Sequence, residues 1–326
     1  MPYRFKRKES VSGSIERLSR QCVDKAVKHS REANLESIHS TRKEIKKLRA
    51  VLRLIKGEIG KRSFECRMDC LREAAGYLAP ARDAHVKANA FEHLIRPANR
   101  RRRNGSGLTR RNGSAPVRFG NIPYSLKKDC DEEVQRFREQ NCAKLVRRIL
   151  RKEPAQFKKL KIQNEGWASL GPGLEQCYRA ARATRDEAEA QPSAENFHEW
   201  RKRVKDLWYN IQLLHPIWPE QMCAAAAELE KLGELLGDDH DLHMLAQTAI
   251  KKSVNRDLES EAHQLLEIIG ARKRELQTEA LKLGRSFFQE KPADFCRRLH
   301  GYWKLWKSKK KRRKRQQRQP ADEAAV

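Results

Sequence analysis

Two segments of this chain carry the same cationic residues at the same spacing. Residues 36–55 (ESIHSTRKEIKKLRAVLRLI) and 195–214 (ENFHEWRKRVKDLWYNIQLL) match at a constant offset of 159 positions. Besides a glutamate, the shared polar residues are His39, Arg42, Lys43 and Lys46 in the first copy and His198, Arg201, Lys202 and Lys205 in the second. A helix that only packs into a core needs repeated apolar residues, not repeated cations. The repeat therefore suggests one anionic ligand held from two sides.

The first copy continues its positive charge into the next turns. On a helix, five of its side chains fall within about 80° of one another, beside the apolar stripe: His39, Arg42, Lys46, Arg49 and Arg53. Phosphate suits such an array because arginine offers a bidentate fork and lysine a mobile point charge. Histidine can also donate to phosphate, and we expect its charge to vary near neutral pH. The alternative is a solvated helix face whose cations pair with acids on neighbouring helices.

A second pair of matched elements follows each cationic segment. YLAPARDAHV (77–86) and LLGDDHDLHM (235–244) share Asp83/Asp241 and His85/His243. An aspartate at a helix start caps free backbone N–H groups, so these residues are expected to act as caps, either alone or with an ion pair to the cationic helices. The acidic run 238–243 has metal-ligand residue types, but consecutive side chains at a loop–helix junction point in different directions. We therefore predict no metal and no cofactor.

Composition points to a polyanionic partner. The net charge is +28, and two segments, 96–118 and 304–318, contain arginines or lysines and no acid. Such a field attracts nucleic acid, anionic membrane or phosphate polymer. The eight cysteines are scattered without a CxxC pair, which indicates reduced, buried thiols. No apolar run approaches the ~20 residues that cross a bilayer, and no apolar segment follows the basic start, so we expect a cytoplasmic protein.

Periodicity near 3.6 residues and scarce strand signals predict an all-α fold. We expect two helical bundles of about four helices each, related by internal pseudo-two-fold duplication: residues 1–155, with an extended arginine-rich insertion at 96–123, and residues 165–307, followed by a disordered basic tail at 308–326. Pro80 should break a helix, Ser193 should cap one, and breaks are expected at 163–173 and between 236 and 241. Helices are expected at 14–33, 36–56, 63–77, 83–95, 125–152, 174–190, 195–215, 220–236, 241–252, 256–283 and 290–307.

These residues together resemble the CHAD family, the conserved histidine α-helical domain. The resemblance rests on HxxRKxxKxL at His39–Leu48 and again at His198–Leu207, on LxxxRD at Leu78–Asp83, and on LLGDDHDL at Leu235–Leu242. It spans about residues 10–300 in both halves. The resemblance implies two related helical bundles that bind inorganic polyphosphate in a basic groove, and association with polyphosphate granules, as in many bacterial members.

Carried over by position, the resemblance implies a polyphosphate site without catalytic residues. The residues that would contact polyphosphate are the repeated histidines and cations of both segments, together with Arg49: His39, Arg42, Lys43, Lys46, His198, Arg201, Lys202 and Lys205. Arg20, Arg53 and Arg179 are candidate additions. Trp208 stands where an arginine is expected, which weakens the second half of the site. The ExExK strand pattern of triphosphate tunnel enzymes is absent.

Two other functions remain open at this point. The basic tail and insertion favour nucleic-acid binding, RNA included, although the repeated helices offer few aromatic residues for base stacking. An enzyme acting on phosphates would need a general base and Mg²⁺ carboxylates beside the cationic groove. His39 and His198 are the candidate phosphoacceptors, and Asp83 and Asp241 the candidate acids. No nucleophile–base arrangement follows from their spacing, so we predict a binding protein and no enzyme. Oligomeric state does not follow from the sequence.

Overall fold

The computed structural model describes residues 3–103, 119–254 and 256–316. Within these residues the chain forms helices and no strand, which confirms the predicted all-α class. In chain order the elements are α1 (Val11–His29), α2 (Leu35–Leu54), η1 (Lys56–Glu58), α3 (Lys61–Tyr77), α4 (Ala79–Arg103), α5 (Asn121–Glu139), α6 (Cys142–Leu150), α7 (Glu153–Lys158), α8 (Trp167–Ala190), α9 (Ala194–Leu214), η2 (His215–Ile217), α10 (Pro219–Lys252), α11 (Arg256–Phe287) and α12 (Pro292–Gln316).

Side-chain caps fix the starts of both cationic helices. Before α2, the Asn34 side chain accepts a hydrogen bond from the backbone N–H of Ser37 at 2.8 Å. Before α9, the Ser193 hydroxyl accepts one from the backbone N–H of Asn196 at 3.1 Å, as predicted. Each cap satisfies one of the free N–H groups of a helix start. Pro80 lies in the first turn of α4, directly after α3 ends, so the break predicted there is confirmed.

The break expected between residues 236 and 241 is wrong, because α10 runs unbroken from Pro219 to Lys252. Glycine and aspartate have low helix propensity, but tertiary packing outweighs it. The helix contacts α9, α11 and α4. Asp239 is 2 % exposed, and its Oδ1 accepts a hydrogen bond from Gln277 at 2.8 Å and lies 3.3 Å from Nζ of Lys273. These contacts hold the GDD segment of α10 against α11.

Several other boundaries also differ from expectation. The helix expected over 125–152 is two helices, α5 and α6, separated at Asn141, which adopts the left-handed φ of 52° that asparagine tolerates. Helix α4 continues to Arg103, so the extended insertion expected from residue 96 does not begin there. Helix α8 begins at Trp167, inside the expected break. Helix α12 reaches Gln316, so disorder from residue 308 is wrong for 308–316; residues 104–118 and 317–326 lie outside the described part of the chain.

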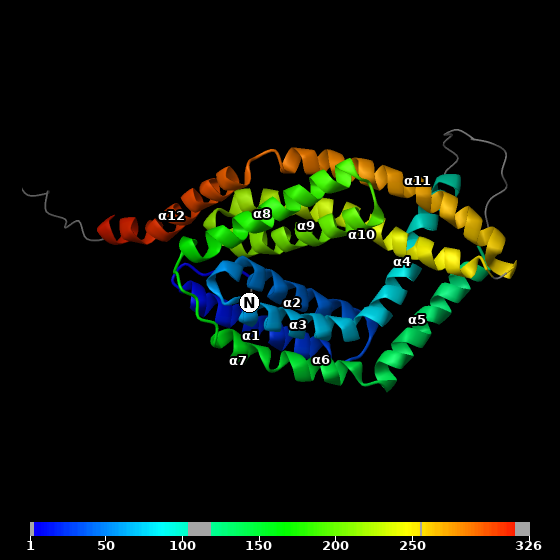
Figure 1. The fold of residues 1–326 in the computed structure, drawn as a ribbon, viewed down its shortest axis with the longest axis horizontal. Helices are drawn as coiled ribbons and strands as arrows, with labels where there is room; N and C mark the ends of the chain where they lie inside the picture. Colours follow the sequence, from blue (N-terminus) through cyan, green and yellow to red (C-terminus); the bar gives the residue numbers. More distant parts are fainter. Residues whose placement is uncertain (1–2, 104–118, 255, 317–326) are drawn as a thin grey trace, which may run out of the picture.

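Two apolar cores hold the helices together. The larger core draws on α1, α2, α3, α6 and α7 from the first predicted half and on α8, α9, α10 and α12 from the second. The smaller core joins α4 and α5 to α10 and α11. Figure 1 shows α1–α3 below α8–α10, with α4, α5 and the α10–α11 pair at one end and α12 at the other. Both cores therefore join segments from the two predicted halves.

The cysteines are free thiols, but the prediction that they are buried is wrong for some of them. Cys66 and Cys223 are exposed, and Cys70 is partly exposed. The remaining five are buried, as expected: Cys22, Cys130, Cys142, Cys177 and Cys296.

Candidate functional site

The two cationic helices contact each other and present their cations to a shared space. Helix α2 packs against α9. Arg53 on α2 donates a hydrogen bond to Asp206 on α9 at 2.8 Å, which ties the two copies together. Lys46 on α2 lies close enough to Arg201 and Lys205 on α9 for their charges to lower its pKa. The structure thus brings cations of both copies to one place.

Sequence reasoning missed one central residue of this site, Arg82 on α4. Its guanidinium lies 3.0 Å from the Asp83 carboxylate and 3.7 Å from the Asp241 carboxylate on α10, and its side chain is 15 % exposed. Its charge lowers the pKa of Arg42, Lys46 and Arg201. The available signal was its position beside Asp83 in the LxxxRD element. We call Arg42, Lys46, Arg82, Arg201 and Lys205 the cationic cluster.

Burial and mutual repulsion make the protonated forms of the cluster costly. Burial, followed by the charges of Arg201 and Arg42, lowers the pKa of Lys46 to about 7. Burial and the neighbouring Arg53 lower the pKa of Arg49 to about 10. The pKa values of Arg42, Arg201 and Lys205 also fall below their ordinary values, with burial as the largest cause. An anion among these groups would favour their charged forms.

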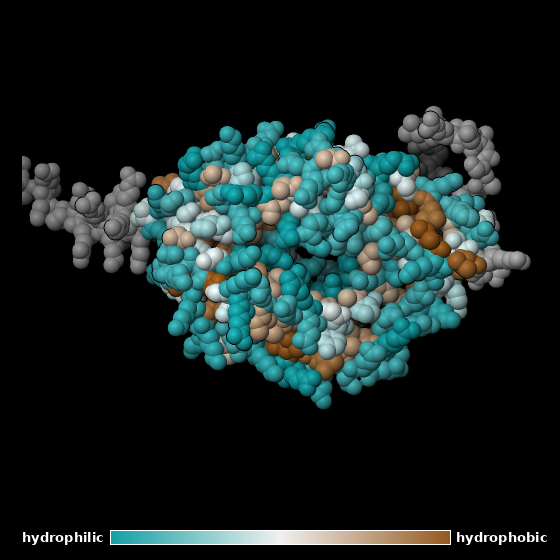
Figure 2. All heavy atoms as spheres, in the orientation of Figure 1, coloured by the Kyte–Doolittle hydropathy of each residue, from teal (hydrophilic) through white to brown (hydrophobic). Residues whose placement is uncertain are grey.

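Some nitrogens of the site are buried without a hydrogen-bond partner among the described residues. They are the donors Nε of Arg49 and Nε of Arg201, together with Nδ1 of His198. A buried donor left unpaired costs free energy comparable to a lost hydrogen bond, on the order of 1–3 kcal/mol. Figure 2 shows a hollow lined by hydrophilic residues between the regions of α2 and α10. Both observations fit a site that accepts a ligand rich in hydrogen-bond acceptors.

Two histidines of the site, His198 and His240, have pKa values well below physiological pH. His198 stacks on His240 of α10, with ring centroids 4.0 Å apart. Burial and Lys202 lower the pKa of His198 to about 4, and burial and His198 lower that of His240 to about 3. The pKa of the more exposed His39 is also lowered, by partial burial and Lys46. Charge variation near neutral pH, expected for these histidines, is therefore wrong for His198.

A glycine and a tryptophan position the Lys205 side chain of α9. A Cβ atom on Gly233 of α10 would lie 2.7 Å from Cε of Lys205, so glycine allows this side chain to cross the helix. The Lys205 ammonium lies 4.7 Å from the ring centroid of Trp208, a cation–π distance. Trp208 thus supports a cation of the site, although it replaces the arginine that the resemblance leads one to expect.

Asp241 does not cap a helix, because it lies within α10. The cap predicted for it is wrong, and its carboxylate lies 3.7 Å from the guanidinium of Arg82 on α4. Burial raises the pKa of Asp241, while Arg82 and Arg201 oppose that shift. The charges of Asp241 and Asp238 partly offset that of Arg201. Among the described residues, no group of three or more His, Cys, Asp or Glu side chains is arranged to hold a metal ion.

Other predicted residues lie at the rim of the cluster or away from it. Lys43 and Lys202 are exposed; Lys43 lowers the pKa of Lys205, and Lys202 pairs with Glu199 at 2.9 Å. Arg20 on α1 and Arg179 on α8 are also exposed, each paired with a glutamate one turn earlier in its own helix. Arg53, as shown above, is engaged by Asp206. The described residues include no helix long and apolar enough to span a bilayer.

The described residues form an all-helical fold in which partly buried cations lie between two helices of repeated sequence, and comparison with known proteins gives its family. The family model of the CHAD domain matches residues 17–250, so the chain belongs to the CHAD domain family. The fold is similar to that of the crystal structure of the CHAD domain from the plant Ricinus communis, with a TM-score of 0.56 and 13 % identity, over 88 % of this chain and 94 % of that one. A search of curated proteins found no match.

Proposed function

We propose that this protein binds inorganic polyphosphate at the cationic cluster and catalyses no reaction on it. The observation that carries the proposal is the convergence of five partly buried cations, Arg42, Lys46 and Arg82 with Arg201 and Lys205. Burial and the neighbouring positive charges lower the pKa values of Arg42, Lys46, Arg201 and Lys205. Buried like charges are stabilised by an anion of high charge density. Polyphosphate supplies one negative charge or more on each phosphate and no group that requires an apolar pocket.

The arrangement also supports a preference for long chains. Arginine forks bind phosphate oxygens in pairs, and lysine adds a point charge that follows the chain. Because the cations come from both repeated helices, a polymer that reaches both gains a second contact without a second association step. Counterion release from the polymer should make the affinity strongly dependent on salt.

A binding role also agrees with the position of the nearest carboxylates. Asp83 and Asp241 face Arg82. We propose that they orient this guanidinium and do not act as general bases. We further propose a cytoplasmic location with attachment to polyphosphate granules, which a fluorescent fusion observed beside a polyphosphate stain would test.

Competition binding with matched charge reversals tests the proposed site. Labelled long-chain polyphosphate is titrated into the full chain at near-physiological salt, with RNA and DNA as competitors. Arg42→Glu/Arg201→Glu should lower the affinity by at least about 100-fold, because each charged hydrogen bond contributes about 1.5–3 kcal/mol. Arg20→Glu/Arg179→Glu makes the same change of charge on exposed helix faces and should lower it only severalfold.

Two results would contradict the proposal. Equal losses in the two double variants would mean that overall charge, and not the cluster, governs binding. A loss of affinity only after deletion of residues 304–326 would assign binding to the basic C-terminal segment. Circular dichroism and thermal melts would establish that the variants fold.

A further inference from the structure

An aromatic cleft lies at the opposite end of the molecule from the α4–α5 pair, where α8 begins beside α12. It has a volume of about 610 Å³ and is lined by Trp167, Ala168, His300, Trp303, Lys304, Lys307 and Ser308. The Trp167 indole and the His300 imidazole are parallel within 3°, with centroids 5.5 Å apart, and both are partly exposed. Trp303 contacts Trp167 with ring centroids 5.9 Å apart, Trp306 contacts Trp303 at 5.1 Å, and these two indoles are 5 % and 6 % exposed. The cleft therefore offers flat ring surface together with ammonium groups.

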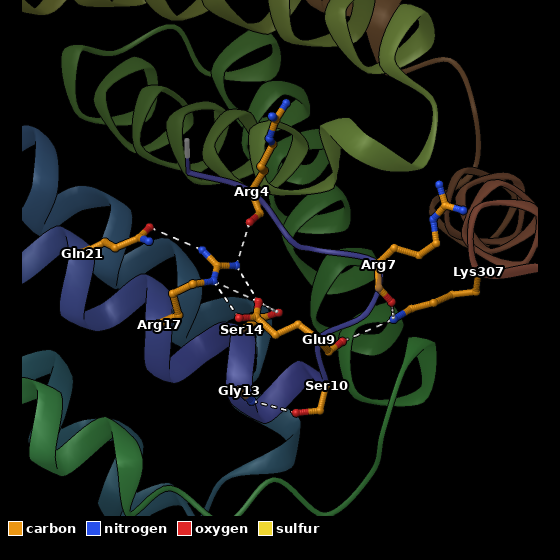
Figure 3. A network of polar contacts seen from close by, with 9 residues as sticks. All are labelled: Arg4, Arg7, Glu9, Ser10, Gly13, Ser14, Arg17, Gln21 and Lys307. Atoms are coloured by element: carbon orange, nitrogen blue, oxygen red, sulfur yellow. Dashed lines mark hydrogen bonds and ion pairs between the residues drawn. The ribbon is translucent and has the colours of Figure 1, made fainter. Parts of the chain in front are cut away.

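The N-terminal segment fixes one wall of this cleft. Lys307 donates a hydrogen bond to the backbone carbonyl of Arg7 at 2.8 Å, and its ammonium lies about 5 Å from the rings of Trp303 and Trp306. Figure 3 shows Lys307 reaching this segment, which is itself held by the Glu9–Arg17 ion pair at 2.7 Å. The indoles of Trp303 and Trp306 are thus buried against Lys307 and the core. Trp167 and His300 remain as the rings that a ligand can touch.

The chemistry of the cleft differs from that of the cationic cluster. Polyphosphate has no flat apolar surface, so ring faces add nothing to its recognition. A strand with bases and phosphates matches both parts, because bases stack on aromatic rings and phosphates follow the adjacent cations. Lys304 is exposed, one turn after His300 on α12, and the sequence from 309 to 315 consists only of lysine and arginine. A duplex keeps its bases stacked inside, which leaves single strands as the matching form.

A membrane surface fits these observations less well. Interfacial helices insert a broad apolar face that includes tryptophan. On α12 the tryptophans are buried within the protein, and Leu305, 57 % exposed, is the large apolar residue of the described part of this helix that faces outward. We propose that Trp167 and His300 form a base-stacking site for single-stranded nucleic acid, with Lys304 beside it for the phosphates.

The test compares strands with and without bases on the full chain. Fluorescence anisotropy measures binding of a labelled 12-nucleotide RNA and of an abasic ribose-phosphate strand of the same length. Wild type should bind the RNA more tightly than the abasic strand. Trp167→Ala should lower the RNA affinity at least about fivefold and leave the affinities for the abasic strand and for polyphosphate unchanged. Trp167→Phe should restore the preference. His300→Ala is a second variant, useful if Trp167→Ala fails to fold.

The same preference measured in Arg42→Glu/Arg201→Glu separates this site from the polyphosphate site, because base-dependent binding should persist there. Equal affinity of wild type for both strands would overturn the proposal. So would Trp167-dependent binding to anionic phosphatidylserine vesicles without a base preference, which would assign the cleft to membranes. A dimer in sedimentation that Trp167→Ala dissociates, again without a base preference, would assign it to a second copy of the chain.

Discussion

The two repeated helices begin alike and then diverge. Over the first turns α2 and α9 carry the same histidine, arginine and lysines, but Arg49 of α2 corresponds to Trp208 of α9, and Arg53 corresponds to Gln212. Of the two additional arginines on α2, Arg53 is engaged by Asp206 of the other copy. The matched turns therefore supply four of the five cations of the cluster, and Arg82 of α4 supplies the fifth. The unmatched turns join the two helices or support a cation.

The histidines of the two copies diverge in the same way. His39 is exposed, whereas His198 is partly buried and stacked on His240. The same residue type at matching positions of the two helices therefore has different surroundings. Position in the repeat is therefore a weaker guide to a residue's chemistry than the helices packed against it.

The largest effect should come from breaking the link between the copies. Arg53→Met leaves the Asp206 carboxylate, 14 % exposed, without its ion-pair partner. Removing one partner of a buried pair costs on the order of 3 kcal/mol in the free energy of unfolding. Urea unfolding at pH 7 measures this loss, and Arg20→Met, which removes an exposed arginine from α1, is the matched control with an expected change below about 1 kcal/mol.

The pH dependence and the double variant distinguish this ion pair from simple packing. Burial raises the pKa of Asp206, so in Arg53→Met the carboxyl should become protonated, and the loss of stability should shrink, as the pH falls through that raised pKa. Arg53→Met/Asp206→Leu should recover most of the stability, because no charge is left unpaired. If the double variant is as unstable as the single one, the arginine contributes by packing alone.

The fold could be predicted from the sequence where one element carried its own signals. The cationic helices α2 and α9 were predictable within about two residues, because their apolar stripes and the Ser193 cap are local features. The GDD segment was misread as a break, since the burial of Asp239 against α11 decides its conformation, and a distant helix leaves no mark on local propensity.

The candidate site shows the same limit. The cations of α2 and α9 stood out because they repeat at a fixed offset. Arg82 did not, because the corresponding position in the second half is His240, and its role depends on the contact between α4 and α10. Arg20 and Arg179 were included by analogy of position, yet each has a glutamate of its own helix. Contacts between elements, which decide these cases, cannot be derived from helical periodicity.

An intermediate effect should appear in the pH dependence of polyphosphate binding, in which we expect Lys46 of α2 and its counterpart Lys205 of α9 to contribute differently. The pKa of Lys46 is about 7, and a bound phosphate should raise it. Above pH 7 the free protein must therefore take up one proton at Lys46 when it binds polyphosphate. Its affinity should fall by up to about tenfold per pH unit in that range. Titrations between pH 6 and 9 on wild type, Lys46→Met and Lys205→Met measure this, and Lys46→Met should lose the dependence.

The stability of the free protein should change in the opposite direction. Because the pKa of Lys46 is lower in the folded than in the unfolded chain, the unfolded chain binds more protons above pH 7, and stability from this group rises with pH. Lys46→Met should flatten that rise. A wild-type affinity that stays constant from pH 6 to 9 would show that Lys46 does not change its protonation on binding.

The smallest effect should come from the aromatic residue that distinguishes α9 from α2. Trp208→Leu removes the ring 4.7 Å from the Lys205 ammonium, and a cation–π contact contributes about 0.5–2 kcal/mol. We expect polyphosphate affinity to fall about two- to fivefold, since Lys205 loses its fixed position. Trp208→Phe keeps a ring and should keep most of the affinity.

A double-variant cycle sharpens this test. In Lys205→Met, replacing Trp208 by leucine should have no further effect on affinity, because the two residues act through one contact. An equal loss in both backgrounds would mean that Trp208, which is 7 % exposed, acts through general packing of α9. A gain of affinity in Trp208→Leu would mean that the ring competes with phosphate for the ammonium. Trp208 would then lower the contribution of α9 to polyphosphate affinity. The tryptophan in place of the expected arginine would in that case weaken the site.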